Sequence, residues 1–330
     1  MTERRGIIGA GNWVADIIKD IDHWPGEGNL CTILRQETAP GGGACNVLLD
    51  LAALGTDIPL YAAGCLGDDD TGRWILAEVR RRGIDVSRMR LVPDAPTSYT
   101  DVMSGQGRRT FFHCRGANAR FDPDCAADLD VGAKVFYLGH LLILDRLDAE
   151  DAEYGTRAAR LLHRMRQRGC LTTIDCVSDA PQRFRHAILS AIPHLDCLTI
   201  NEVEAGNTFG LAIRRPDGTL DQEALRRAMA LFFESGLRTR VVIHYPEGAA
   251  ALDASGEFQQ IASFPVERIV GSNGAGDAFC AGIVYAMHEG LSLRESLRYG
   301  AASASFNLRS PSGFGGAATL VELRARLGDA

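Results

Sequence analysis

Hydrophobic positions recur alternately at helical and at strand spacing along most of the chain from about residue 42. Val47, Leu51 and Leu54 fall on one helical stripe, and the apolar run at 240–245 is typical of a buried strand. Strands are expected at 58–67, 134–143, 170–176, 196–201, 240–245 and 249–254, and helices at 71–84, 150–168, 181–191, 221–235, 275–288 and 293–308. This alternation predicts an α/β fold with a mainly parallel sheet and helices on both faces, a three-layer arrangement.

Two segments depart from the alternation. Residues 91–116 carry β-branched and aromatic positions around a glycine-containing turn, which predicts a hairpin. Residues 14–21 form an earlier extended segment, directly after the first strand. We expect segments of about 12–40 and 91–118 to build a small β-lid, inserted into a single domain that spans residues 1–330.

One carboxylate falls on the apolar face of the early extended segment. Val14, Asp16 and Ile18 share that face by the two-residue period of a strand. Burying a carboxylate is costly unless it meets a polar partner. Asp16 therefore either lies at a solvated edge or is held to accept hydrogen bonds from a ligand.

The first glycines of the chain resemble part of a dinucleotide-binding turn, but the rest of that pattern is missing. Gly9 and Gly11 have the expected spacing, whereas Val14 stands where a third small residue is needed. The turn-forming run at 22–30 would then break the helix that should follow. The pattern therefore disfavours a classical NAD site.

Composition and charge narrow the possible partners. The formal net charge of -7 argues against a nucleic-acid binder. Lys19 and Lys134 are the chain's two lysines, so few lysines are available for catalysis. The nine cysteines include no C-x-x-C pair and suggest reduced thiols in a cytoplasmic protein. No stretch approaches the roughly 18 apolar residues of a membrane helix, and the amino-terminal apolar run is too short for a signal peptide.

A glycine-rich turn near the carboxyl end carries the clearest candidate chemistry. A strand-like segment at 268–270 leads into Gly274, Ala275 and Gly276, and a helix follows. The unpaired amides and the positive dipole end of such a helix suit an anion, phosphate above all. Asp277 lies in the same first turn, where it either caps the helix or serves as a general base beside the anion hole.

These residues belong to a longer series of motifs. Residues 274–279 with the following Ala281-Gly282 resemble the carboxyl-terminal motif of the ribokinase-like (PfkB) carbohydrate kinase family. The paired glycines, asparagine and helix of 41–55 are similar to the family's amino-terminal motif. Further resemblances fall, in the expected order, at 64–89, 116–118 and 201–204. The chain is thus identified as a member of this family, with the corresponding Rossmann-like fold.

The resemblance implies ATP-dependent phosphorylation of an alcohol group on a sugar or sugar-like molecule. Asp277 would take the proton from the acceptor hydroxyl, and the backbone amides of Gly274, Ala275, Gly276 and Asp277 would form the anion hole. The positions that match the family's acceptor-binding residues are Asp16, Gly42, Gly43 and Asn46.

The resemblance also implies a nucleotide site and partners. Asn201 and Glu204 would act around the ATP phosphates and Mg²⁺, with Glu204 reaching the metal through water. His244, Gly248 and Ala301 are the further ATP-binding candidates. Because lid segments in this family often pair between subunits, the resemblance suggests a homodimer through the lid.

Two departures from the family pattern stand out. Gly271 replaces the aspartate that helps some relatives bind a monovalent cation, which argues against potassium activation. In the nucleotide loop, His244 replaces a threonine and Pro246 a glycine. His244 then either contacts the nucleotide or caps a strand.

The sequence does not decide which chemical class of acceptor molecule the protein binds. Arg108 and Arg109 either grip a phosphorylated sugar or form a solvated turn, and His113 and Arg115 are better candidates for facing the ligand. His140 either contacts substrate or is a core histidine. Two phenylalanines, at 111 and 112, fit either the lid core or a stacking surface for a base. A nucleoside kinase and a catalytically silent sugar or nucleotide sensor are the alternatives.

Overall fold

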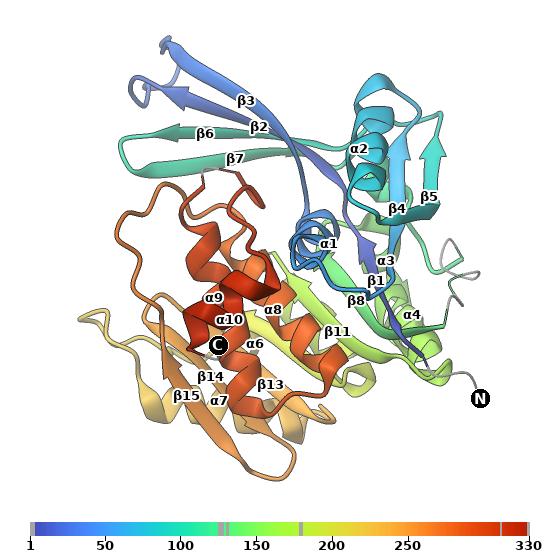
Figure 1. Cartoon of the computed structure of the whole chain (residues 1–330), viewed down its shortest axis with the longest axis vertical. Helices are drawn as coiled ribbons and strands as arrows, with labels where there is room; N and C mark the ends of the chain where they lie inside the picture. Colours follow the sequence, from blue (N-terminus) through green and yellow to red (C-terminus); the bar gives the residue numbers. More distant parts are fainter. Residues whose placement is uncertain (1–3, 125–128, 130–131, 178–180, 311, 329–330) are drawn as a thin grey trace.

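The computed structural model describes residues 4–124, 129, 132–177, 181–310 and 312–328. In these residues a large sheet lies between two layers of helices, and a small sheet projects from its upper edge (Figure 1). The arrangement confirms the expected α/β class. Within the described part of the chain, no helix has the length and apolar character needed to span a bilayer.

The large sheet has nine strands in the order β15-β14-β13-β12-β11-β8-β1-β4-β5. Their bounds are β1 Gly6–Gly11, β4 Leu60–Gly67, β5 Asp85–Val92, β8 Ala133–Leu141, β11 Leu171–Cys176, β12 Cys197–Asn201, β13 Arg240–Tyr245, β14 Gly248–Asp253 and β15 Phe258–Ala262. From β13 to β5 all neighbours pair in parallel, and β14 and β15 add antiparallel strands at one edge. The carboxyl ends of the parallel strands therefore meet along one edge, where ligands bind in such folds.

Helices cover both faces of this sheet. Their bounds are α1 Gly43–Ala53, α2 Asp70–Arg81, α3 Asp145–Asp148, α4 Arg157–Gln167, α5 Pro181–Ala191, α6 Glu202–Phe209, α7 Gln222–Glu234, α8 Ala275–Glu289, α9 Leu293–Asn307 and α10 Leu320–Leu327. Successive residues of β1 point to opposite faces: Ile7 packs in one buried cluster with α1, α8 and α9, and Ile8 in another with α4, α5 and α7.

The lid sheet, as we call the small sheet, joins two distant parts of the chain. Its strands are β2 Val14–Ile21, β3 Ile33–Gly41, β6 Tyr99–Gly105 and β7 Arg108–Cys114, in the order β3-β2-β6-β7. β2 pairs with β6 in parallel and the other pairs are antiparallel. Asn118 fixes the start of the sheet, because its side chain bonds both the backbone N–H and the C=O of Trp13.

Two expected elements are corrected by the structure. The helix expected from residue 150 begins at Arg157, since residues 150–156 include two short paired strands and the helix cap Thr156. The strand expected at 268–270 is absent. Residue Ile269 is 63% exposed, and the adjacent sheet edge is already formed by β14 and β15.

Helix α8 is held in place by close helix packing. It is buried along nearly its whole length and runs against α9. A Cβ on Gly282 of α8 would lie 2.6 Å from the carbonyl oxygen of Tyr299, and one on Gly300 would lie 3.0 Å from the ring of Phe279. These two glycines allow the close approach that fixes the position of the amino end of α8.

The expected free thiols are confirmed for the described residues. Eight cysteines are free of disulfides, and six of them are buried. Cys125 lies outside the described residues.

A buried carboxyl group without a partner lies on α1. Asp50 is 6% exposed, and neither of its side-chain oxygens has a hydrogen-bond partner among the described residues. It borders a cavity of about 10 Å³ together with Ser303 of α9 and Ala281 of α8. Burial, and to a lesser degree the charge of Asp277, raise the pKa of Asp50 well above its usual value. The folded protein therefore keeps the Asp50 proton to a higher pH than the unfolded chain does.

We expect Asp50→Asn to remove a pH-dependent loss of stability. Above about pH 4 the unfolded chain releases the Asp50 proton while the folded chain keeps it. The free energy of unfolding therefore falls by up to about 1.4 kcal/mol per pH unit from this group. Urea unfolding at pH 5 and pH 8 should show a larger gain for the variant at pH 8. An equal effect at both pH values would contradict the assignment.

Candidate active site

Two cavities reach the first turn of α8, and we name each after the ligand that the sequence predicts for the residues around it. The nucleotide-side cavity, of about 570 Å³, is bordered by Asn201, Glu202, Val203, His244, Tyr245, Pro246, Gly248, Ser263, Phe264, Ile269, Ser272, Ala275, Gly276, Phe279, Ala301, Ala304, Ser305 and Leu308. The acceptor-side cavity, of about 480 Å³, is bordered by Asn12, Val14, Asp16, Gly42, Asn46, Thr100, Phe111, His113, His140, Ile143, Val177, Asn273 and Asp277. The helix start thus contributes to both.

Asp277 lies in the first turn of α8 and borders the acceptor-side cavity together with Asp16. Its Oδ2 accepts a hydrogen bond of 2.8 Å from Nδ2 of Asn46, and its Oδ1 lies 3.0 Å from Nε2 of His140. Burial acts to raise the pKa of Asp277, but the interactions with His140 and Asn46 outweigh it and hold that pKa below its usual value. Asp277 is therefore an ionised carboxylate.

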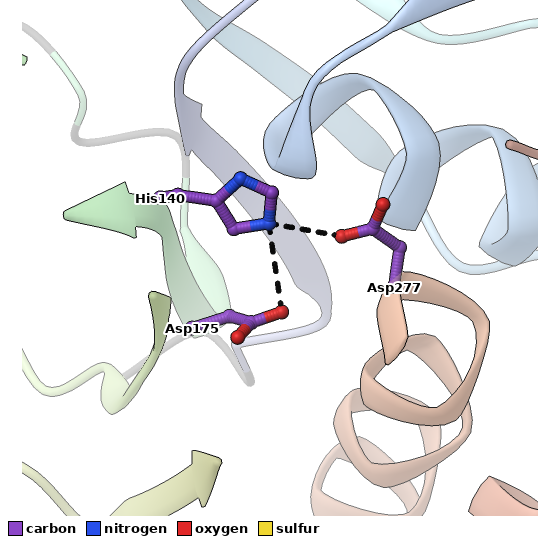
Figure 2. A group of neighbouring side chains, drawn as sticks. All are labelled: His140, Asp175 and Asp277. Atoms are coloured by element: carbon purple, nitrogen blue, oxygen red, sulfur yellow. Dashed lines mark hydrogen bonds and ion pairs between the residues drawn. The ribbon is translucent and has the colours of Figure 1, made fainter. Parts of the chain in front are cut away.

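His140, near the end of β8, bridges the carboxylate of Asp175 at the end of the neighbouring strand β11 and that of Asp277 in the first turn of α8 (Figure 2). Its Nε2 lies 3.0 Å from Oδ1 of Asp277 and 3.6 Å from Oδ2 of Asp175, which belongs to β11. Burial acts to lower the pKa of His140, yet the two carboxylates raise it well above the usual value. The imidazole is therefore protonated between them.

The three groups form the one candidate cation cluster found among the described residues. Their ligand atoms lie within 4.8 Å of one another. Because Nε2 of His140 already lies within ion-pair distance of both carboxylates, the imidazolium supplies the positive charge at this place. We assign no metal there.

The position of His140 depends on two residues from other elements. Oδ1 of Asn12 accepts the backbone N–H of His140 at 2.8 Å and that of Gly43 at 2.9 Å. A Cβ on Gly43 would lie 2.6 Å from Nε2 of His140, so a side chain there would displace the ring. Of the predicted acceptor residues, Gly43 thus lies behind His140 and does not border the cavity.

Asp16, Gly42 and Asn46 border the cavity as the sequence suggested. Oδ2 of Asp16 would lie 2.3 Å from a Cβ on Gly41, which explains the glycine at the end of β3. Burial raises the pKa of Asp16 to about 7, with Asn273 lowering it and the charge of Asp277 raising it. Asp16 is therefore poised between its neutral and charged forms near neutral pH.

Of His113 and Arg115, which the sequence predicts to face the ligand from the second half of the lid, the cavity includes one. His113 borders the cavity and shares a hydrogen bond of 2.9 Å with Oγ1 of Thr100. Arg115 instead pairs with Asp145, outside the residues that border the cavity. The guanidinium of Arg108 lies over the ring of Trp24. None of the described residues that border this cavity is arginine or lysine.

The turn before α8 has the backbone geometry of an anion site. Gly274 has a positive φ of 73°, and a Cβ there would lie 2.0 Å from the carbonyl oxygen of Gly313. Only glycine fits such a position without strain. Ala275 and Gly276 follow and border the nucleotide-side cavity. As first-turn residues they have no intrahelical acceptor for their N–H groups, and that of Ala275 donates a long bond of 3.4 Å to the carbonyl oxygen of Ser272.

Of the predicted nucleotide residues, Asn201, His244, Gly248 and Ala301 border the nucleotide-side cavity. The ring of His244 packs on Phe279, and burial lowers the pKa of His244 below its usual value. His244 thus borders the cavity and packs on α8, and its contact with a nucleotide stays a prediction.

Glu204 is placed differently from the other nucleotide residues. It is 3% exposed, does not border the cavity, and its Oε2 accepts the backbone N–H of Asn201 at 3.1 Å. Asn201 in turn caps α6 by accepting the N–H of Glu204. The nearby Glu202 is paired with Arg214. Glu204 therefore stabilises the start of α6.

Comparisons with known proteins identify the class and then the family. The solved structure of Arabidopsis thaliana ribokinase complexed with ribose and ATP matches with a TM-score of 0.80 at 22% identity, covering 98% of each chain. The chain thus has the ribokinase fold. The model of the pfkB family carbohydrate kinases matches residues 11–317, and the chain belongs to that family. It is an ATP-dependent carbohydrate kinase, which confirms the class expected from the motifs.

Two curated relatives agree with this assignment. Ribokinase from Arabidopsis thaliana is 28% identical over 91% of this chain and 74% of its own length. Ketohexokinase from Mus musculus is 25% identical over 90% of this chain and 94% of its own length.

We expect acceptor binding to tighten as the pH rises through 7. Asp16, with its pKa of about 7, becomes a full hydrogen-bond acceptor only when ionised. Between pH 6 and pH 8 its ionised fraction, and with it the apparent affinity, should rise about tenfold.

The dissociation constant of the acceptor, measured across this pH range, tests the expectation. Asp16→Asn should bind more weakly and without this pH dependence. Asp20→Asn, an exposed position of the same strand that pairs with Arg35, is the matched control. An unchanged pH profile in Asp16→Asn would rule out Asp16 as the titrating group.

Proposed function

We propose that the protein transfers the γ-phosphoryl group of ATP to a hydroxyl of a neutral sugar or sugar-like molecule. One observation carries the proposal: the first turn of α8 presents Asp277 to one cavity and the backbone of Ala275 and Gly276 to the other. A base for the acceptor and amides for the phosphate are thus adjacent, which suits a reaction that depends mainly on positioning and charge stabilisation.

In the proposed mechanism, Asp277 takes the proton of the acceptor hydroxyl as the new O–P bond forms and the bond to the β-phosphate oxygen breaks. The amides of Gly274, Ala275, Gly276 and Asp277 donate hydrogen bonds to the oxygens of the moving phosphoryl group. Such donors act where charge develops, in a site partly shielded from water. The low pKa of Asp277 keeps it ready to accept the proton.

Polar atoms for the acceptor hydroxyls come from β2 and α1. Oδ1 of Asn46 is buried and has no hydrogen-bond partner among the described residues, although its Nδ2 is bonded to Asp277. It is therefore available to a hydroxyl donor, as is the carboxylate of Asp16. Since none of the described residues at this cavity is arginine or lysine, its lining favours a neutral acceptor over a phosphorylated one.

The described residues fit ATP better than they fit a directly bound magnesium ion. The nucleotide-side cavity lies against the glycine-rich turn, where phosphates bind to helix amides. Glu204 and Glu202 are instead occupied by protein partners. We expect Mg²⁺ to accompany the ATP phosphates, and we derive no step through it.

A nucleoside acceptor is the second candidate. Phe111 of β7 borders the acceptor-side cavity and is 56% exposed, which leaves a ring face for stacking on a base. A lid-mediated homodimer and a cytoplasmic location stay predictions from the sequence.

We expect Asp277→Asn to lower the turnover number by 10²- to 10⁴-fold, the usual contribution of general-base catalysis. The acceptor's dissociation constant should change little, because the amide preserves the shape of the side chain. A product-detecting screen of polyols, hexoses, pentoses and nucleosides with ATP identifies the acceptor, and calorimetry gives its affinity.

Asp70→Asn, at a fully exposed position in the first turn of α2 that pairs with Arg73, is the matched control for this measurement. Full turnover by Asp277→Asn would exclude it as the base. Ligand binding without phosphorylated product across the whole screen would favour the silent sensor.

We also expect little response to the monovalent cation. Gly271 offers no carboxylate where some relatives bind one, so exchanging potassium for sodium at constant ionic strength should leave turnover nearly unchanged. Steady-state rates in the two salts measure this. A strong dependence on potassium would show that other groups complete a cation site.

A further inference from the structure

The proposed base has a cationic partner that the mechanism above does not use. Nε2 of His140 lies 3.0 Å from Oδ1 of Asp277, on the oxygen opposite the one bonded to Asn46. Asp175 lies on the other side of the same nitrogen at 3.6 Å, and Figure 2 shows the second ring nitrogen pointing away from both carboxylates. Oδ1 of Asp175 accepts the backbone N–H of Cys176 at 2.7 Å, which fixes the carboxylate.

The imidazole is clamped by its surroundings. Its backbone N–H is bonded to Asn12, and its ring packs against Gly43 at the start of α1, where no side chain would fit. Asn12 in turn holds the N–H of Gly43. The ring therefore has a defined place relative to Asp277, as a residue that positions a catalytic group requires.

The charges around the bridge are mostly negative. The titratable groups that interact with Asp277 or His140 from the packed elements are Asp16 of β2, Cys45 and Asp50 of α1, His113 of β7, Tyr137 of β8, Asp175 of β11, His244 of β13 and Cys280 of α8. Burial lowers the pKa of both His113 and His244. His140 is thus the positive centre among these carboxyl groups, and buried carboxylates need such a partner.

We propose that Asp175 and His140 are positioning residues: Asp175 keeps the imidazole of His140 protonated, and the imidazolium keeps Asp277 ionised with its Oδ1 fixed at the acceptor-side cavity. The inference rests on the proposed role of Asp277 as the base. The effect of His140 on Asp277 is purely electrostatic. The proton on Nε2 of His140 does not move, and the proton of the acceptor hydroxyl goes to Asp277. Asp277 thereby stays ionised at a lower pH than an isolated aspartate would. The same stabilisation makes its carboxylate a weaker base.

The pairing itself can be tested without any substrate. In protein with labelled histidine rings, NMR should show His140 protonated well above pH 6.5, and Asp175→Asn should lower its titration midpoint by roughly one to three pH units. His163→Gln, in a ring cluster of α4 away from the cavities, assigns a second signal and serves as the control. A His140 midpoint near 6.5 in the unaltered protein would overturn the proposal, whatever the enzyme phosphorylates.

The consequence for catalysis is read from the acidic limb of kcat against pH, measured at saturating acceptor and ATP. Asp16, with its pKa of about 7, would itself shape the acidic limb of kcat/KM. His140→Gln keeps a donor of similar reach but removes the charge, so the limb should move up by roughly one to three pH units. Asp175→Asn should move it in the same direction by less. A lowered kcat in His140→Gln with an unmoved limb would show a merely structural role and contradict the proposal. Loss of all turnover in the unaltered protein, with the NMR result intact, would instead count against the proposed function.

Discussion

The hydrogen bond between Nδ2 of Asn46 and Oδ2 of Asp277 is the contact on which the site depends. It joins the first turn of α1 to the first turn of α8, across 231 positions of sequence. Both helices begin after a glycine with positive φ, Gly42 and Gly274, and their positively polarised amino ends lie near the same place. Burying a carboxylate between two positively polarised helix ends is favourable because each end stabilises negative charge.

Two carboxyl groups of the same cavity are given opposite properties by their neighbours. Asp277 has a cation and an amide as partners, and its pKa falls. Asp16 lies against the backbone of β3 with little positive charge nearby, and its pKa rises to about 7. Such divergence is the usual way in which one site assigns a base and a binding group from identical side chains. A chain with two lysines achieves it with the imidazole of His140 and the side-chain amide of Asn46.

Local patterns in the sequence were enough for the fold class, for Asp277 and for Asp16. The glycine turn before α8 and the two-residue period of β2 are contained within a few positions, so no distant contact is needed to recognise them. Strands β5 and β15 were missed, since both are partly exposed and lack a continuous apolar run. The strand expected at 268–270 was wrong because sheet membership depends on a partner that local hydrophobicity does not reveal.

The ion-pair bridge at His140 shows more clearly what local sequence patterns cannot predict. The sequence does not decide whether His140 contacts substrate or lies in the core, and it does not distinguish Asp175 from other acidic residues. The one usable signal is that Asp175 is a carboxylate at the end of a buried strand. The bridge depends on β8 and β11 being neighbours in the sheet, and on α8 packing against both with its first turn at Asp277. The same holds for Arg115, whose partner Asp145 lies 30 positions away.

The residues around the two cavities do not overlap, and they meet through the first turn of α8. Substitutions on β2, β6 and β7 can therefore accumulate without disturbing the half that receives the phosphoryl donor. A duplicated gene of this architecture can diverge toward a new acceptor by drift in its lid alone. The residues around the nucleotide-side cavity are then inherited unchanged.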